Sequence, residues 1–179
     1  MRLSDVSADS SNREPLNGEP LNHARLWIWR HWRLNLPDDW EMLQFSRNPQ
    51  QGSCAFADRY QFRLEFHWRE VAGPPDFGRM MSDYEARLKE QGMAKPGRVQ
   101  RGAWQGIEGE AEGVLSTRFG RHYPEAGFLI EVVFLWAESR DRDLTGKVLD
   151  SIEPEPVRGD GLRRWRTFGM DCLVSPGLE

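Results

Sequence analysis

The chain has 179 residues, with 24 Lys and Arg against 28 Asp and Glu and a formal net charge of −4 at pH 7. This length holds one domain with a tail at each end. Because both charge signs are interspersed along the chain, no basic patch for nucleic acid or an anionic membrane is visible, and we expect neither as a partner. Cys54 and Cys172 lie far apart without CxxC spacing, which indicates free thiols.

The first 23 residues are predicted to be a flexible tail. They are polar, lack periodicity and contain the small tandem EPLNGEPLN, so they bury too little apolar surface to offset the entropy of ordering. No apolar run in the chain has the length of a signal peptide or a membrane span, which predicts a cytoplasmic location. The domain itself is expected over residues 24–156.

The segment YQFRLEFHWRE has the clearest pattern in the chain. Large apolar residues alternate with polar ones, a period of two that predicts a β-strand with one buried face. The residues expected on that face are Tyr60, Phe62, Leu64, Phe66 and Trp68. Three earlier segments, LWIWRHWRLNL, WEMLQF and SCAFADR, are predicted to be further strands of an antiparallel meander.

The apolar spacing becomes helical after Pro75, and a helix is predicted to follow the N-cap Asp76 and to stop at Gly92. From Gly97 strands resume in RVQRGAW, in GIEGEAEGVLSTRFGR and in FLIEVVFLWAES, whose nearly continuous apolar character is typical of a central strand. A second helix is predicted in RDRDLTGKVLDSIEP, stopped by Pro154. The predicted fold class is α+β, an antiparallel β-sheet with two main helices packed on it.

The glycines of GIEGEAEG do not have the spacing of a phosphate-binding loop, and the glutamates between them would repel a phosphate. We interpret Gly106, Gly109 and Gly113 as bulges or sites of close backbone approach in a strand.

The order of elements resembles the Mog1/PsbP-like superfamily over residues 26–155. The resemblance rests on the LNLPDDWE opening, the hairpin strands, the helix near the middle, the second meander and a closing helix that ends in VLDSIEPEP. It implies a sandwich of helices on an antiparallel sheet and a binding module more than an enzyme, since that fold serves in small-GTPase binding, photosystem assembly and bacterial effector chaperones. No functional residue carries over, because no motif of the resemblance is itself a site.

Tryptophans cluster near the start of the domain. A surface cluster of this kind would grip a partner's side chains, although most tryptophans are usually buried. If LWIWRHWRLNL is one strand, Trp27 and Trp29 share a face and Trp32 points the other way, so at least one of them should lie off the core. The interface candidates are Trp27, Trp29, Trp32 and Trp40.

The polar face of the YQFRLEFHWRE strand carries the ligand candidates Arg63, Glu65 and His67. No histidine has metal-ligand spacing to another His, Cys or carboxylate, and no Ser or Cys is flanked by a base, so we expect no metal site, no cofactor and no catalytic residue. The favoured function is a non-catalytic protein-binding or assembly module. The alternative is a small-molecule-binding protein or small enzyme that uses this polar face.

Residues 157–179 are predicted to be a linker followed by a strand. The stretch WRTFGMDC from Trp165 resembles WRHWRLNL from Trp29, with Trp165 and Arg166 aligned to Trp29 and Arg30. We interpret this strand as the possible start of a truncated second repeat, or as the final strand of the single domain. An unpaired strand would add to a sheet edge, so the expected partner is another protein or a second copy of the chain.

Overall fold

The computed structural model describes residues 24–93, 96–111 and 113–175. In chain order, these residues form β1 (Ala24–Trp29), β2 (Trp32–Pro37), β3 (Glu41–Phe45), β4 (Gln51–Ala57), β5 (Phe62–Glu70), α1 (Phe77–Glu90), β6 (Gly97–Arg101), β7 (Trp104–Ala111), β8 (Val114–Tyr123), β9 (Phe128–Trp136), α2 (Arg142–Ser151), β10 (Glu153–Pro154), β11 (Arg163–Thr167) and β12 (Met170–Val174).

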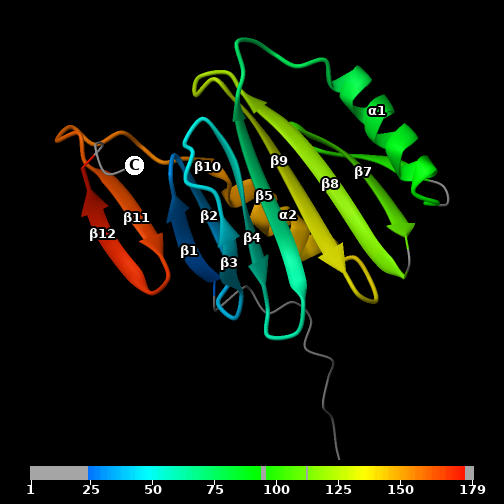
Figure 1. Cartoon of the computed structure of the whole chain (residues 1–179), viewed down its shortest axis with the longest axis horizontal. Coiled ribbons are helices and arrows are strands. Elements are labelled where there is room, and N and C mark those ends of the chain that lie inside the picture. The colour runs from blue at the N-terminus through cyan, green and yellow to red at the C-terminus, as the bar shows by residue number, and fades with distance from the viewer. Residues whose placement is uncertain (1–23, 94–95, 112, 176–179) are drawn as a thin grey trace, which may run out of the picture.

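The strands form two antiparallel sheets, which overlap in Figure 1 where β1 and β2 lie beside β3 and β4. The larger sheet has the order β3-β4-β5-β9-β8-β7-β6 and the smaller one β10-β2-β1-β11-β12. The two sheets meet through aromatic side chains: the ring centroids of Trp27 and Phe56 are 5.4 Å apart, and those of Trp32 and Phe66 are 6.1 Å apart. The predicted α+β class is confirmed, but the prediction of one sheet is wrong, because β1 and β2 leave the meander to build a second layer.

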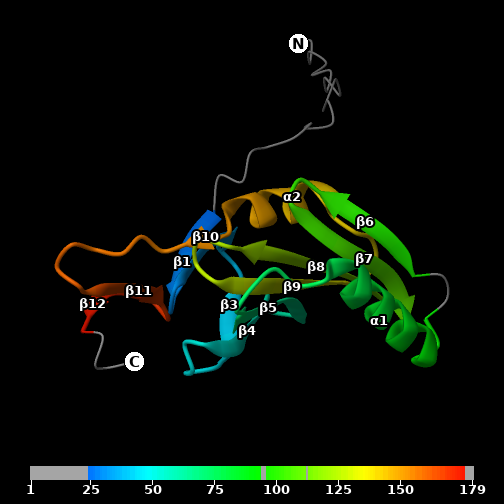
Figure 2. The same cartoon turned by 90° about the horizontal axis from the view of Figure 1, so that it is seen from above.

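The two helices cover opposite faces of the seven-stranded sheet (Figure 2). Helix α1 begins at the predicted cap, where the Asp76 carboxylate accepts a hydrogen bond of 3.0 Å from the backbone N–H of Arg79. It ends before Gly92, whose φ of +80° is left-handed. Helix α2 buries Val148 and Leu149 in the core between the sheets. The seven-stranded sheet therefore has one face toward α2 and the smaller sheet, and one face that α1 covers in part.

A tight turn at Arg30 and His31 corrects the orientation expected for Trp32. Arg30 has a φ of +58°, and the chain reverses there, so Trp29 and Trp32 are opposite each other in the β1–β2 register. Opposite residues of an antiparallel pair point to the same face. Trp32 therefore points into the core beside Trp29, and LWIWRHWRLNL is a hairpin instead of one strand.

Two further strand predictions need correction. In β5 the side chains of Leu64, Phe66 and Trp68 are buried as expected, but Tyr60 lies in the preceding turn at 81% exposure and Phe62 is exposed at the strand's start. The segment GIEGEAEGVLSTRFGR forms two strands, β7 and β8, with Gly113 at a φ of +76° between them. The central position predicted for FLIEVVFLWAES is confirmed, because β9 lies between β5 and β8.

The C-terminal segment forms a hairpin of two strands, not one. Strand β11 pairs with β1 at Ile28 and Arg166, and β12 pairs with β11. The two segments that resemble each other in sequence occupy different positions in their hairpins, because Arg30 lies in a turn whereas Arg166 lies within a strand. The smaller sheet thus contains strands from before and after residue 156. The interpretation of the C-terminal segment as the start of a second repeat stays a prediction.

Candidate functional site

The four tryptophans predicted as interface candidates are all buried. Trp27 and Trp32 are no more than 1% exposed, and Trp29 and Trp40 no more than 7%. The expectation that one of them lies off the core is wrong, since the β1–β2 hairpin directs Trp27, Trp29 and Trp32 to the same inner face. These residues fill the space between the two sheets.

An aromatic surface does exist, but other residues form it. Phe45 at the end of β3 and Phe168 in the β11–β12 turn are each 41% exposed, with ring centroids 5.2 Å apart. Trp29 lies beneath both, at 5.1 Å from Phe45 and 6.2 Å from Phe168. Sequence reasoning missed the pair because Phe45 and Phe168 meet only when the two sheets stack. The clustering of large apolar side chains at one surface is typical of an interaction site.

The β11–β12 hairpin extends beyond the edge of the seven-stranded sheet (Figure 1). Its inner face contains Trp165 and Thr167 of β11 and, opposite them in register, Cys172 and Met170 of β12. Trp165 and Thr167 contact the core, through Trp29 and Met42. Met170 and Cys172 are exposed, because the larger sheet ends at β3. The β12 half of the inner face, with Met170 and Cys172, is therefore left uncovered by the described chain.

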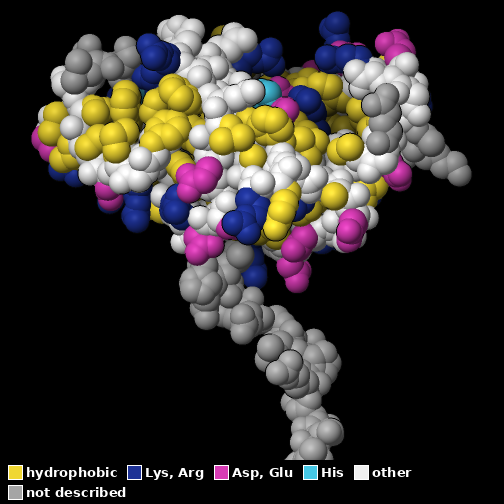
Figure 3. Space-filling model, turned by 60° about the horizontal axis from the view of Figure 1, so that its bottom comes forward, with side chains coloured by type: hydrophobic (Ala, Val, Ile, Leu, Met, Phe, Trp, Pro, Cys, Tyr) yellow, Lys and Arg dark blue, Asp and Glu magenta, His cyan; other side chains and the backbone are white. Residues whose placement is uncertain are grey.

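A groove of about 610 Å³ lies beside this inner face. Glu41 at the start of β3, Trp27 of β1 and Phe168 and Met170 of the hairpin are among its lining residues. Figure 3 shows hydrophobic side chains gathered over the end of the molecule that carries β11 and β12. Strand β3 is the edge of its sheet, so one side of its backbone has no strand partner in the described chain. We call the outer edge of β3 together with the inner face of β12 the edge groove.

The polar ligand candidates lie on the face of the seven-stranded sheet that carries α1. Glu65 and His67 are together, with 3.2 Å between Oε2 and Nε2. The hydrogen bond with His67 lowers the pKa of Glu65, although burial of the carboxylate opposes the shift. Arg63 does not join them, because its Nε donates to the Asp58 carboxylate at 2.6 Å. The structure therefore brings two of the three candidates together.

Three residues from other elements extend this polar pair. Glu131 of β9 is opposite His67 in the register of β5 and β9. The hydroxyl of Tyr84 on α1 donates to the Glu131 carboxylate, and the Arg118 guanidinium of β8 lies 3.6 Å from it. Burial raises the pKa of Glu131, against the effect of the nearby His67 and Arg69. Only strand register and the packing of α1 gather these residues, so the sequence pattern could not show them.

No cysteine thiol belongs to this polar group. The one buried thiol, Cys54, lies on the opposite face, and burial raises the pKa of that thiol far above its usual range. Among the described residues, no three His, Cys, Asp or Glu side chains are placed to bind a metal ion together. What the arrangement presents to a polar molecule is the imidazole of His67 and the guanidinium of Arg118, beside the carboxylates of Glu65 and Glu131.

Comparison with known proteins identifies no family. No family model matches the sequence, and no curated protein matches it. A solved crystal structure of a protein from Bacteroides thetaiotaomicron is similar at 15% sequence identity and a TM-score of 0.40, over 70% of this chain and 45% of that one. The present chain thus spans less than half of that protein's length. Neither helix of the described residues is long and apolar enough to cross a membrane.

Proposed function

We propose that the chain is a protein-binding module that takes up an extended segment of a partner protein in the edge groove. The observation that carries this proposal is the groove between the two sheets, where Glu41 of the edge strand β3 and the exposed Met170 of the hairpin line the same hollow. A strand added to β3 would lie under the β11–β12 hairpin. The partner would therefore need apolar side chains at alternate positions, facing the hairpin.

Both components of binding are available in the groove. The backbone N–H and C=O groups on the free side of β3 would form main-chain hydrogen bonds with the added strand. Met170 and the exposed ring of Phe168, which both line the groove, would cover its apolar side chains and supply specificity. A bulge between Met42 and Gln44 interrupts the pairing of β3 with β4. The residues of β3 on either side of this bulge would therefore set the register of the added strand.

The experiment is a selection from a displayed library of ten-residue peptides, followed by calorimetry with each selected peptide. We expect sequences that alternate apolar and polar residues, and slower hydrogen exchange in β3 on binding. Met170→Asp should reduce affinity at least tenfold, because it places a charge on the apolar face. Leu173→Asp is the matched control: Leu173 is on the outer face of the same strand and is 45% exposed, against 51% for Met170.

Equal loss of binding in both variants, or an empty selection, would contradict the proposal. Light scattering on the wild-type chain tests the other occupant: a dimer that Met170→Asp converts to a monomer would make the occupant a second copy. The binding role agrees with what the Mog1/PsbP-like resemblance implies. That membership and a cytoplasmic location remain proposals.

A second candidate is small-molecule binding on the polar face of the larger sheet. A hollow of about 260 Å³ there is lined by Glu65 and His67 of β5, with Ser53 of β4 beside them. An imidazole and a carboxylate next to a hydroxyl suit a polar ligand. The test is a titration with a panel of polar metabolites, monitored by the backbone NMR signals of β4 and β5, which the wild type and the variant share. Shifts that disappear in His67→Gln would support it.

A further inference from the structure

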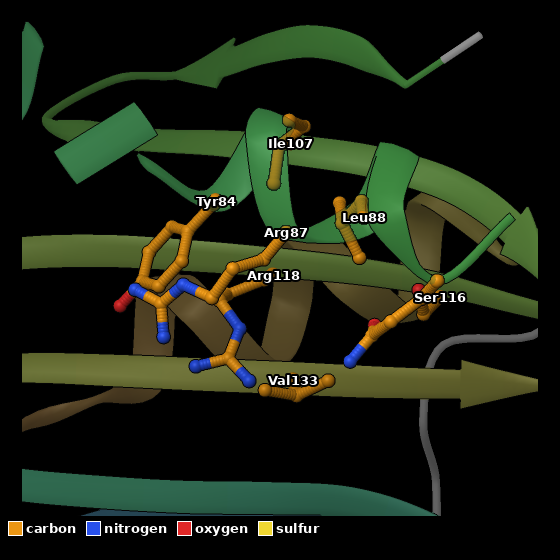
Figure 4. A pocket seen from close by; sticks show the side chains of 8 residues that line it. Tyr84, Arg87, Leu88, Ile107, Ser116, Arg118 and Val133 are labelled. Atoms are coloured by element: carbon orange, nitrogen blue, oxygen red, sulfur yellow. The ribbon is translucent and has the colours of Figure 1, made fainter. Parts of the chain in front are cut away.

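A pocket of about 170 Å³ lies between α1 and the strands β7, β8 and β9. Tyr84, Arg87 and Leu88 line it from the helix, and Ile107, Arg118 and Val133 line it from the sheet (Figure 4). It shares no residue with the edge groove or with the hollow beside His67. It is therefore a third pocket, although Tyr84 and Arg118 also belong to the polar group that extends the Glu65–His67 pair.

Two positive charges meet at this pocket. The guanidinium carbons of Arg87 and Arg118 lie 5.1 Å and 4.9 Å from the centroid of the Tyr84 ring, and Figure 4 shows both side chains beside that ring. Burial lowers the pKa of Arg118, and the charge of Arg87 lowers it further, against the effect of Glu65. No carboxylate of the described chain lines the pocket. A bound anion would therefore neutralise part of the positive charge of Arg87 and Arg118, which the fold partly buries at a cost in free energy.

The nearby carboxylates only partly compensate Arg118. The Glu131 Oε1 atom is 3.6 Å from the Arg118 Nη1 atom, longer than a hydrogen bond, and it already accepts a hydrogen bond from the Tyr84 hydroxyl. Glu65 is hydrogen-bonded to His67. Within the described residues, neither carboxylate forms the two-pronged pairing that guanidinium groups favour. Arg118 therefore keeps hydrogen-bond donors for a ligand.

The rest of the pocket is apolar. Ile107 and Val133 form a buried floor on the sheet, and Leu88 faces them from α1. The volume is close to the roughly 150 Å³ of an engineered protein cavity that holds benzene. The body of a fitting ligand is therefore about the size of one aromatic ring. A bare inorganic anion would leave this apolar surface unused.

We propose that this pocket binds a small carboxylic acid with a compact apolar body, as its carboxylate anion. The carboxylate accepts hydrogen bonds from Arg87 and Arg118, and the body packs between Leu88, Ile107 and Val133. A singly charged anion suits the site, because Glu65 and Glu131 already compensate part of the charge of the two arginines.

Benzoate is the probe, titrated into the isotope-labelled full chain and followed by the backbone NMR signals of β7, β8 and α1. We expect saturable shifts at Ile107 and Val133, with a Kd on the order of 1 mM for a ligand this small. Benzamide has nearly the same shape without the charge and should bind at least about tenfold more weakly. Inorganic phosphate, which has charge but no apolar body, should also bind more weakly than benzoate.

Two variants separate ligand contacts from folding. Arg87 is exposed on α1, so Arg87→Met should leave the fold unchanged while it weakens benzoate binding about tenfold; Arg118→Met should do the same or more. The control is Arg121→Met, because Arg121 lies on the other face of β8, over the ring of Tyr123 at 4.3 Å. Benzoate binding that is unchanged in both test variants, matched by benzamide, or located away from Ile107 would overturn the proposal.

Discussion

The indole rings of Trp29 on β1 and Trp165 on β11 lie with their centroids 4.9 Å apart. This contact, together with the register pair of Ile28 and Arg166, attaches the β11–β12 hairpin to the smaller sheet. The guanidinium of Arg30 lies over both rings, at 5.2 Å and 5.3 Å. The two segments that resemble each other in sequence are therefore neighbours in one sheet, and the edge groove depends on the contact between them.

We expect Trp165→Ala to lower the free energy of unfolding by about 2 to 4 kcal/mol, because the half-buried ring covers Trp29 and closes this end of the core. Urea unfolding followed by circular dichroism measures the loss. Trp165→Phe keeps an aromatic ring in place and should cost less. If the alanine variant unfolds at the wild-type urea concentration, the hairpin adds nothing to the stability of the domain.

The turn before β5 predicts a pH dependence at Asp58. Burial raises the pKa of this carboxyl, but hydrogen bonds from the backbone N–H groups of Tyr60 and Gln61 and from the Arg63 guanidinium outweigh it, so the pKa is below its usual 3.8. Because the folded pKa is depressed, the stabilisation is present above about pH 4 and is lost as the pH falls through the folded pKa.

Asp58→Asn should therefore cost about 1 to 2 kcal/mol of unfolding free energy at pH 7. Denaturation at pH 7 and again below pH 4 provides the measurement, and the gap between wild type and variant should narrow at the lower pH. A gap that stays constant with pH would show that Asp58 acts through its shape and not its charge.

Glu131 should show the opposite sign. Its pKa is raised, chiefly by burial, so its contribution to stability is present below the unfolded pKa of about 4.5 and is lost as the pH rises through the folded value. Glu131→Gln removes the buried charge and keeps an oxygen that accepts from Tyr84. We expect it to be as stable as wild type or about 1 kcal/mol more stable at pH 7, with no such advantage at pH 4. Thermal unfolding at both pH values decides this.

Gly106 is a site of close backbone approach, as its sequence context predicted. A Cβ atom there would lie 2.5 Å from the carbonyl oxygen of Arg118 and 2.7 Å from the Phe119 ring. Gly106→Ala should therefore cost about 2 to 3 kcal/mol, since a neighbouring strand has to move. In the matched Gly97→Ala the nearest atom is 3.7 Å away, on Glu108, and the change should stay within about 0.5 kcal/mol. Similar losses in the two variants would contradict the steric explanation.

Local sequence patterns determined much of the secondary structure. The alternation around Leu64 and Phe66 predicted β5, and Asp76 and Gly92 predicted the ends of α1. These predictions work because the period of a strand or helix decides which side chains share a face, and because capping depends only on residues a few positions apart. The same rule placed Glu65 and His67 on one side of β5.

The tertiary structure alone decided which sheet each strand joins and which residues meet. The turn at Arg30 has neither Asn-Gly nor Asp-Gly, so the β1–β2 hairpin and the buried position of Trp32 could not be read from the sequence. Likewise, strand register and the packing of α1 bring Tyr84 and Arg118 to one pocket. Such contacts join residues far apart in the chain, and they depend on the burial of both sheets at once, which no local pattern encodes.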